Sequence, residues 1–356
     1  MCIYSITQLM LLAKGYIKIA KYYFILYTLS MYKALSNKKS ELDKFRPLPP
    51  ELVTNLDDWF RVELTYTSNA IEGNTLTRKE TALVVEKGLT VRGKSLHEHF
   101  EAHNHSKALD FIKSLVDKKS SGITEKDILE IHRLILHGID DDNAGKYRSV
   151  PVRISGSMVV LPNYVKVPIL MNKLVATLFQ NSQKYHPVEL ALLAHYELVT
   201  IHPFADGNGR TARLLMNLIL IQNGYPPAII NKRDRDRYIT SLEKAQLGGS
   251  RENFDKLIVK AVNKSFTIYL NAVKGKDIPI KSIQKLIKIG ELAKLTGQSV
   301  PTIRYWTSKG LLKVSSKTEK GYSLYDIKQI EQVKQILALK SERYSLNEIE
   351  LILQKN

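Results

Sequence analysis

The sequence predicts a mainly helical protein with a small second domain, on the strength of three observations. Leucine-rich and lysine-rich segments with helical spacing run through most of the chain, separated by capping residues and glycines. Strand signal is confined to 149–162, where two valine-rich arms flank Gly156 and predict a short β-hairpin. A linker-like stretch follows at 274–286. We therefore expect a helical core at 47–273 and a separate domain at 287–356.

Composition narrows the class of protein further. The 356 residues are 44% apolar, which excludes a mostly disordered chain. The single cysteine, Cys2, rules out a disulfide framework and a thiolate zinc site, and it suits a reducing, cytoplasmic location. The net charge is +18, and both ends of the chain are more basic than the middle. Basic ends favour an acidic partner such as nucleic acid, although lysine kept for solubility gives the same pattern.

Residues 1–46 form an apolar and basic N-terminal segment. Its longest uncharged run, 1–13, is shorter than the roughly 18 residues that a membrane-spanning helix needs, so a membrane protein is not expected. The segment lacks the features of a signal peptide. An interfacial helix, a docking segment and a reading frame that truly starts at Met31 all remain open.

The most informative stretch is 202–213, which reads HPFADGNGRTAR. It joins two apolar segments, so it is expected to be a polar loop that leads into the start of a helix. Gly207 and Gly209 allow tight turning, and their amides, with that of Asn208, can bind an anion at the helix N-terminus. Arg210 and Arg213 are three residues apart on one face, a spacing that suits phosphate oxygens.

Two further side chains in this stretch suggest a reaction. Asp206 is a hard oxygen ligand that could hold Mg²⁺ against phosphates, and His202 has a pKa range suited to a general base. Taken singly, each has a plainer interpretation: a helix-end histidine, a glycine turn, an ion pair between Asp206 and Arg210. Their combination in twelve residues favours a polyphosphate site.

The stretch resembles the Fic signature HxFx(D/E)GNGRxxR at every defined position. Ala144–Arg148 with the following hairpin resembles the Fic flap, expected at 149–162. The resemblance implies a protein adenylyltransferase that moves AMP from ATP to a Ser, Thr or Tyr hydroxyl. It implies that His202 is the base and Asp206 the Mg²⁺ ligand. It also implies that Gly207, Asn208 and Gly209 hold the α-phosphate, while the two arginines hold the outer phosphates.

A second stretch, TSNAIEGN at 67–74, places Ser68 and Glu72 on one face of a helix that Gly73 would end. An exposed glutamate is the ordinary interpretation. The stretch resembles the Fic inhibitory motif (S/T)xxxE(G/N), expected in a helix around 62–73. That resemblance implies that Glu72 pairs with Arg213 and inhibits productive ATP binding. In some members of the family the same glutamate helps to remove AMP, and the direction here stays open.

Four histidines cluster in HEHFEAHNH at 97–105. His99 and His103 are four apart on a helix and could form a metal pair, or they could belong to a polar helix face.

Residues 287–356 show a helix, a short glycine turn and a second helix, the helix-turn-helix pattern. Candidate DNA contacts are Thr302, Arg304 and Lys309 on the second helix, with Lys317 and Lys320 in the loop that follows. A basic module for protein interaction is the alternative. The segment IGELAKLTGQSVPTIRYWTSKGLL, followed by GYSLYDIKQI, resembles the winged helix-turn-helix of MerR regulators, which implies DNA binding.

The sequence therefore predicts an autoinhibited adenylyltransferase that uses ATP and Mg²⁺. Its expected partners are a target protein, which could be the chain itself, and DNA; a homodimer is left open. The alternative function is a nucleotide-sensing transcription regulator with little catalysis.

Overall fold

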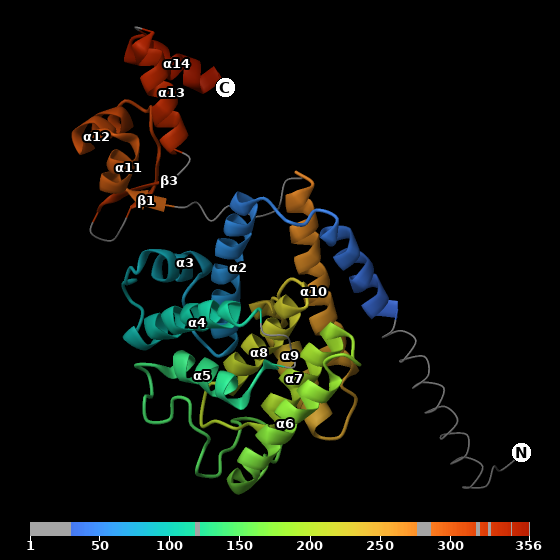
Figure 1. The fold of residues 1–356 in the computed structure, drawn as a ribbon. Helices are drawn as coiled ribbons and strands as arrows, with labels where there is room; N and C mark the ends of the chain where they lie inside the picture. Colours follow the sequence, from blue (N-terminus) through green and yellow to red (C-terminus); the bar gives the residue numbers. More distant parts are fainter. Residues whose placement is uncertain are drawn as a thin grey trace, which may run out of the picture. The chain divides into compact units, whose positions relative to one another are not determined.

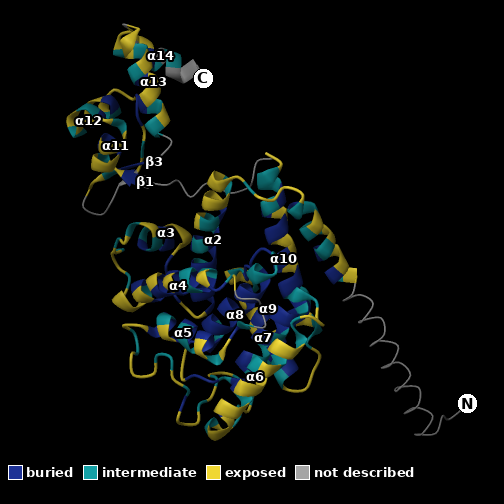
Figure 2. Cartoon of the chain, viewed as in Figure 1, coloured by how far each residue is buried: buried dark blue, intermediate teal, exposed yellow. Residues whose placement is uncertain are grey.

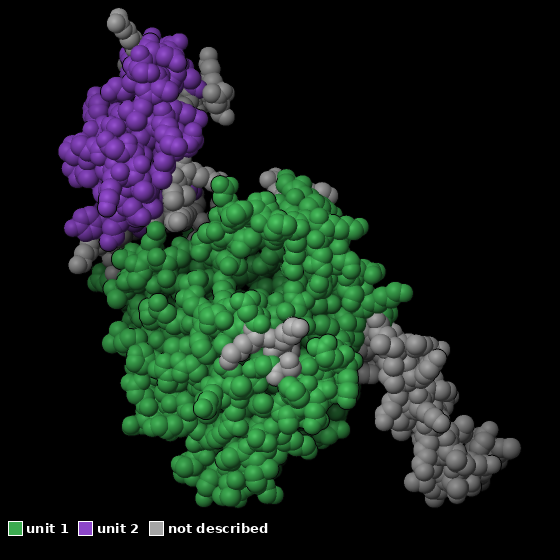
Figure 3. All heavy atoms as spheres, in the orientation of Figure 1, with its two compact units in different colours: residues 1–279 green, residues 280–356 purple. Residues whose placement is uncertain are grey.

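The computed structural model describes residues 30–117, 122–275, 286–317, 321–326, 329–342 and 344–355. The chain divides into two compact units, residues 1–279 and 280–356 (Figure 3). The division falls within the linker expected at 274–286, of which residues 276–285 lie outside the described part. Residues 1–29 of the N-terminal segment also lie outside it.

Unit 1 is built almost entirely from helices (Figure 1). A helical stretch at 30–43 precedes them. The named helices are α2 (Pro50–Ile71), α3 (Arg78–Lys87), α4 (Leu96–Ser114), α5 (Glu125–Leu136), α6 (Val167–Asn181), α7 (Pro187–Ile201), α8 (Asn208–Gln222), α9 (Arg235–Gln246) and α10 (Glu252–Val273), with short 3₁₀ turns η2 (Tyr164–Lys166) and η3 (Lys232–Asp234).

Helix α8 is the centre of this unit. Its residues are buried on every side from Asn208 to Leu220, apart from the half-buried Gly209, as Figure 2 shows by the dark blue at its position. A helix buried on every side lies inside a core, and its few polar residues then need partners there. Helices α2, α4, α5 and α7 contact α8. The motif loop lies between the end of α7 at Ile201 and the start of α8 at Asn208.

Local signals in the sequence account for the helix starts and stops. Thr77 and Glu80 form a reciprocal capping box at the start of α3, and Gly73, with φ of 105°, follows the end of α2. Helix α2 is longer than the expected 62–73, because it begins after Pro49 with Pro50 in its first turn. Glu72 is its C-cap residue.

The flap at 149–162 differs from the prediction in one respect. The turn lies at Ser155 and Gly156 as expected, but the two arms form no strand ladder, so the β-hairpin is a turn with two extended arms. Side chains bind the backbone of the flap instead. Arg148 donates to the carbonyls of Val150 and Pro162, and Glu243 of α9 accepts the amide of Met158. Backbone groups bound in this way are not available to a ladder.

The helical stretch at 30–43 belongs to the core of unit 1. Tyr32, Leu35 and Leu42 are buried in it, and the ring of Tyr32 stacks on His186 at 4.7 Å. The domain boundary predicted at residue 47 therefore leaves out a segment that packs as part of the same unit. Among the described residues, no helix is long and apolar enough to cross a membrane.

Unit 2 has its own core around Trp306, Ile303, Val333 and Ile336. Its elements are β1 (Leu286–Lys288), α11 (Ile289–Thr296), α12 (Val300–Ser308), β2 (Val314–Lys317), β3 (Ser323–Asp326), α13 (Gln329–Ser341) and α14 (Leu346–Lys355). The three strands form an antiparallel sheet in the order β1-β3-β2. Helices α11 and α12 flank a turn at Gly297, which has a left-handed backbone, and so give the predicted helix-turn-helix with a small wing.

The buried position of Leu42 gives a direct test of the helical stretch at 30–43. We expect Leu42→Ala to lower the free energy of unfolding by about 2–5 kcal/mol, because it leaves a cavity in a packed core. Denaturant unfolding of the full chain measures this. Lys33→Ala in the same stretch is exposed and serves as the control. Equal stability of the two variants would show that the stretch does not pack on the core.

Candidate active site

The motif loop begins at His202, which has an unusual backbone. Of the residues that the structure describes, it is the one non-glycine with a positive φ, 51°. It caps α7 in the left-handed conformation, and its amide donates to the carbonyl of Leu198 at 2.8 Å. Residues other than glycine rarely adopt this backbone conformation, and it persists only where surrounding contacts hold it. The loop is therefore constrained at the residue expected to act as base.

The ring of His202 is held in one tautomer. Its Nδ1 lies 3.3 Å from the carbonyl oxygen of Val199, and a carbonyl can only accept, so Nδ1 carries the hydrogen. The lone pair is then on Nε2. Burial lowers the pKa of His202. The ring is thus neutral at physiological pH with a free basic nitrogen, which is the state a general base needs.

Arg148 anchors the loop from outside the motif. Its Nε donates to the carbonyl of His202 at 2.8 Å, and its own amide donates to the carbonyl of Pro203 at 2.9 Å. Its Nη2 reaches the carbonyl of Pro162 at 2.5 Å, at the far end of the flap. The side chain is buried. Arg148 therefore joins the flap to His202, a role that sequence analysis did not assign although it placed Arg148 in the flap motif.

The rest of the loop is fixed by Asn208 and His132. The Asn208 side chain accepts the backbone N–H of Phe204 at Oδ1 and donates from Nδ2 to the Phe204 carbonyl, at 2.9 Å each. The Phe204 ring stacks on His132 at 3.6 Å. His132 Nδ1 accepts the Gly145 amide, so Nε2 donates to the carbonyl of Asp206 at 3.0 Å. Burial lowers the pKa of His132 to about 4, so this ring is a neutral structural support.

The first amides of α8 are the groups that the sequence predicts as an anion site. Gly207 caps the helix with φ of 76°, and the amides at the start of a helix have no partners within it. The carboxylate of Glu72 lies against this helix start: a Cβ atom at Gly209 would collide with its Oε1. A negative group therefore lies beside the first turn of α8, close to the amides that the sequence predicts as phosphate donors.

Glu72 is paired with Arg213, as the sequence predicts. Arg213 Nη2 lies 2.6 Å from Glu72 Oε1, and the guanidinium also donates to the hydroxyl and the carbonyl of Ser68, at 2.9 and 3.0 Å. Arg213 is 4% exposed. Burial acts against its charge, but Glu72 and Tyr238 outweigh that effect and raise the pKa of Arg213. The arginine is thus a fully charged group buried beside the helix start.

Two further residues, Tyr238 and His195, support Arg213 from behind. The Tyr238 hydroxyl lies 3.4 Å from Arg213 Nη1 and 2.7 Å from His195 Nε2. Burial raises the pKa of Tyr238 and lowers that of His195 to about 3, so both are neutral. No sequence signal reveals this pair, since the two residues lie 43 positions apart on different helices.

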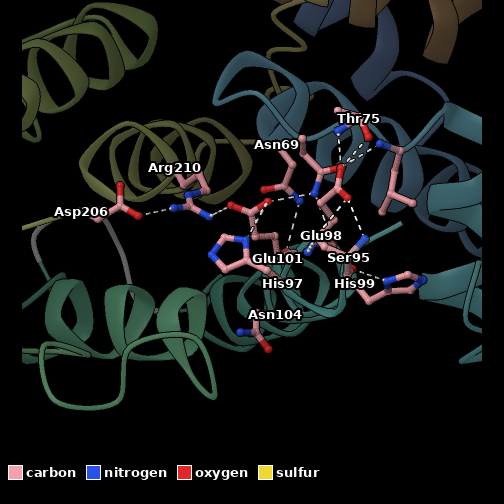
Figure 4. Close-up of polar contacts among 12 residues, drawn as sticks. Asn69, Thr75, Ser95, His97, Glu98, His99, Glu101, Asn104, Asp206 and Arg210 are labelled. Atoms are coloured by element: carbon pink, nitrogen blue, oxygen red, sulfur yellow. Dashed lines mark hydrogen bonds and ion pairs between the residues drawn. The ribbon is translucent and has the colours of Figure 1, made fainter. Parts of the chain in front are cut away.

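Arg210 is bound by two carboxylates (Figure 4). Its Nη1 lies 2.7 Å from Glu101 Oε1, and its Nη2 lies 2.9 Å from Asp206 Oδ2. Arg210 is 2% exposed and Glu101 is 8% exposed. The ion pair with Asp206, one of the plainer interpretations, is therefore present. The predicted role of Arg210 with the outer phosphates stays a prediction, and Glu101 is a site residue that the sequence did not indicate.

The donors for a metal ion are few. The described residues contain no cluster of three or more His, Cys, Asp or Glu side chains. His99 bonds to the Ser95 carbonyl and the Val91 amide, and His105 to Thr65, which favours the polar helix face over a metal pair. The Asp206 side chain is 68% exposed. One carboxylate beside substrate phosphates is the usual protein contribution to a Mg²⁺ site, so the residues fit that ion.

The candidate DNA contacts of unit 2 are spread over its helix-turn-helix and wing. Arg304 and Lys309 are exposed on and after α12. The Thr302 hydroxyl bonds to Ser299 Oγ at 2.8 Å and so supports the helix cap. Lys317 is the last residue of strand β2 and not part of a loop as expected, and Lys320 lies outside the described residues.

Comparison with known proteins places this geometry in a family. The model of the Fic/DOC family matches residues 122–220. A solved Fic-domain protein from Bacteroides thetaiotaomicron is 32% identical, with a TM-score of 0.63 over 70% of this chain and 99% of its own. A fragment of Fic-1 from C. elegans is 31% identical, with a TM-score of 0.67 over 76% of this chain and 78% of its own. The chain belongs to the Fic/DOC family.

Curated Fic proteins are also similar in sequence. A protein adenylyltransferase Fic from Nematostella vectensis is 37% identical over 67% of this chain and 60% of its own length, and one from Aedes aegypti is 40% identical over 62% and 44%. This Fic chain therefore spans about half the length of the curated relatives it matches. The MerR HTH regulatory family model matches residues 287–356, outside the Fic region.

The environment of His202 gives a measurable pKa. Because burial disfavours the charged ring, we expect it to titrate below about 6.5, the value of a free histidine. NMR titration of histidine-labelled protein would show this, with the resonance assigned by its loss in His202→Ala. A peptide covering 199–205 is the control and should titrate near 6.5. A midpoint in the protein at or above that of the peptide would contradict the buried neutral base.

Proposed function

We propose that this Fic protein transfers AMP from ATP to a Ser, Thr or Tyr hydroxyl of a protein. One observation carries the proposal: Arg213, a buried cation in α8 near the loop that bears His202, has the Glu72 carboxylate as its anionic partner beside the first turn of that helix. The names of the curated relatives support the same activity. A nucleotide-sensing regulator without chemistry would not need a constrained histidine with a free Nε2 at this place.

The chain offers complementary groups to a triphosphate. The amides of Gly207, Asn208 and Gly209 would hold the α-phosphate oxygens, and Arg213 would hold an outer phosphate once Glu72 leaves it. Asp206 would hold Mg²⁺, which neutralises phosphate charge as the bond to the leaving group weakens. Because the loop is already fixed by Arg148, His132 and Asn208, these donors need little rearrangement.

His202 would start the reaction at the target hydroxyl. Its Nε2 takes the hydroxyl proton while the oxygen forms a bond to the α-phosphorus of ATP. The bond from that phosphorus to the oxygen bridging the β-phosphate breaks, and pyrophosphate leaves in line. The flap, fixed at one end by Arg148 and at its turn by Glu243, would cover the site and align the target segment by backbone hydrogen bonds.

Glu72 would act as an intramolecular inhibitor. While Glu72 is bound to Arg213, the guanidinium is not available to an outer phosphate of ATP. ATP would then bind without the contact between Arg213 and that phosphate. The same carboxylate could orient water for the removal of AMP from a modified target, and the balance between the two directions is part of the proposal's test.

Removal of the Glu72 carboxylate tests the proposal. We expect Glu72→Gly, incubated with ATP and Mg²⁺, to gain AMP on itself or on added protein faster than the wild type, because Arg213 is then available. Intact-mass analysis measures the gain of AMP units. Glu72→Gly combined with His202→Ala keeps the open arginine but lacks the base, and should not be labelled.

Labelling of that double variant at the rate of Glu72→Gly would exclude His202 as the base. Equal labelling of wild type and Glu72→Gly would exclude inhibition by Glu72. A wild type that removes AMP from protein labelled by Glu72→Gly would show the reverse direction.

We further propose that unit 2 binds DNA, supported by its match to the MerR HTH family and by the exposed Arg304 and Lys309. The cytoplasm remains the proposed compartment, and a homodimer would suit a two-fold DNA site.

A gel shift with DNA from upstream of the gene should show binding that falls steeply with salt. Arg304→Ala should weaken it, whereas Lys33→Ala in unit 1 should not. No shift of the wild type at low salt would leave unit 2 as a protein adaptor.

A further inference from the structure

The C-terminal end of α2 is held by an arginine from another helix. Arg235, the first residue of α9, donates from Nε to the carbonyl of Ile71 at 2.7 Å. Ile71 is the last residue of α2, and Glu72 follows it directly. Arg235 thus binds the backbone next to the inhibitory carboxylate.

Helix α2 lacks what normally stabilises such an end. The last carbonyls of a helix have no partners within it, and the end carries partial negative charge that cations stabilise. Helix α2 has no basic residue in its last turn, and Glu72 adds a further negative charge there. Two arginines from other helices supply what the sequence of α2 does not contain: Arg213 of α8 donates to the Ser68 carbonyl, and Arg235 of α9 donates to that of Ile71.

The same helix also holds the partner of Glu72. Tyr238 lies three residues after Arg235 on α9, and its hydroxyl contacts Arg213. One turn of α9 therefore fixes both members of the ion pair. It holds Glu72 through the end of α2 and holds Arg213 through the phenol.

We propose that Arg235 is a positioning residue for the inhibitory contact: it holds the end of α2 where Glu72 can reach Arg213 across the start of α8. The inference rests on the proposed inhibition by Glu72. Loss of the Arg235 hydrogen bond lets the end of α2 loosen, so Glu72 spends less time on Arg213 and ATP binds productively more often. The Arg235 side chain is 48% exposed, so its removal leaves the core of unit 1 intact.

Self-labelling of Arg235→Ala with ATP and Mg²⁺ tests this assignment. We expect its rate to rise by about tenfold, the effect of losing one hydrogen bond from a charged group. A merely destabilising substitution would lower the rate, so an increase separates positioning from general stability. Arg235→Lys keeps the charge and should fall between wild type and Arg235→Ala.

Two arginines nearby give matched controls. Arg233→Ala and Arg237→Ala remove the same charge from the same short stretch. Their side chains are 78% and 81% exposed, and their nearest carboxylate contacts, to Asp234, are 3.9 and 4.0 Å. Both should label at the wild-type rate. In a Glu72→Gly background, Arg235→Ala should add nothing, because the contact that it positions is already absent.

The outcomes separate this inference from the proposed function. If Glu72→Gly labels faster than wild type and Arg235→Ala does not, the positioning role is wrong and the inhibition stands. If Glu72→Gly is not faster, both fail. Hydrogen exchange gives a second measurement: the amides of Glu72 and Gly73 donate to Asn69 and Ala70, and they should exchange faster in Arg235→Ala. Unchanged exchange there would also overturn the assignment.

Discussion

The site depends on one buried cation, the guanidinium of Arg213. At 4% exposure it has lost most of its contact with water, and a buried charge without a partner is strongly destabilising. Two kinds of neighbouring group stabilise the buried guanidinium. Glu72 supplies the opposite charge, while Ser68 and Tyr238 supply neutral oxygen atoms. Helices α2, α8 and α9 therefore converge on one side chain, and their arrangement follows from its need for partners.

A second constraint is that the groups that hold the motif loop differ from those proposed to contact substrates. His202, Asp206 and the amides of α8 are proposed to contact substrates, and they can remain available only if other groups hold the loop. Arg148, His132 and the Asn208 side chain do this by binding backbone atoms of the loop. The left-handed backbone of His202 is evidence of this support, because a loop without such contacts would relax to a more favourable conformation.

The sequence predicts the parts of this site that are local. The motif loop, the helix start after Gly207 and the stop at Gly73 all follow from short-range patterns, and the Glu72–Arg213 pair was implied by resemblance. Contacts between distant residues escape such patterns. Glu101 neutralises Arg210 from 109 positions away, and nothing in its surroundings marks it as a buried carboxylate. The strand ladder of the flap was predicted wrongly for the same reason, because Arg148 and the distant Glu243 bind the backbone that would have formed it.

The need of Arg213 for an anion also explains how inhibition and activity can exclude one another. A carboxylate and a phosphate present the same feature to a guanidinium, oxygen atoms with negative charge, so either can satisfy the buried cation. Gly209 leaves room beside it for one such group, and that room is filled when Glu72 is present. The apparent affinity for productive ATP then falls with the fraction of molecules in which Glu72 is bound. Activation would require the end of α2 to withdraw from Arg213, whereas the backbone of the motif loop is already held by Arg148, His132 and Asn208.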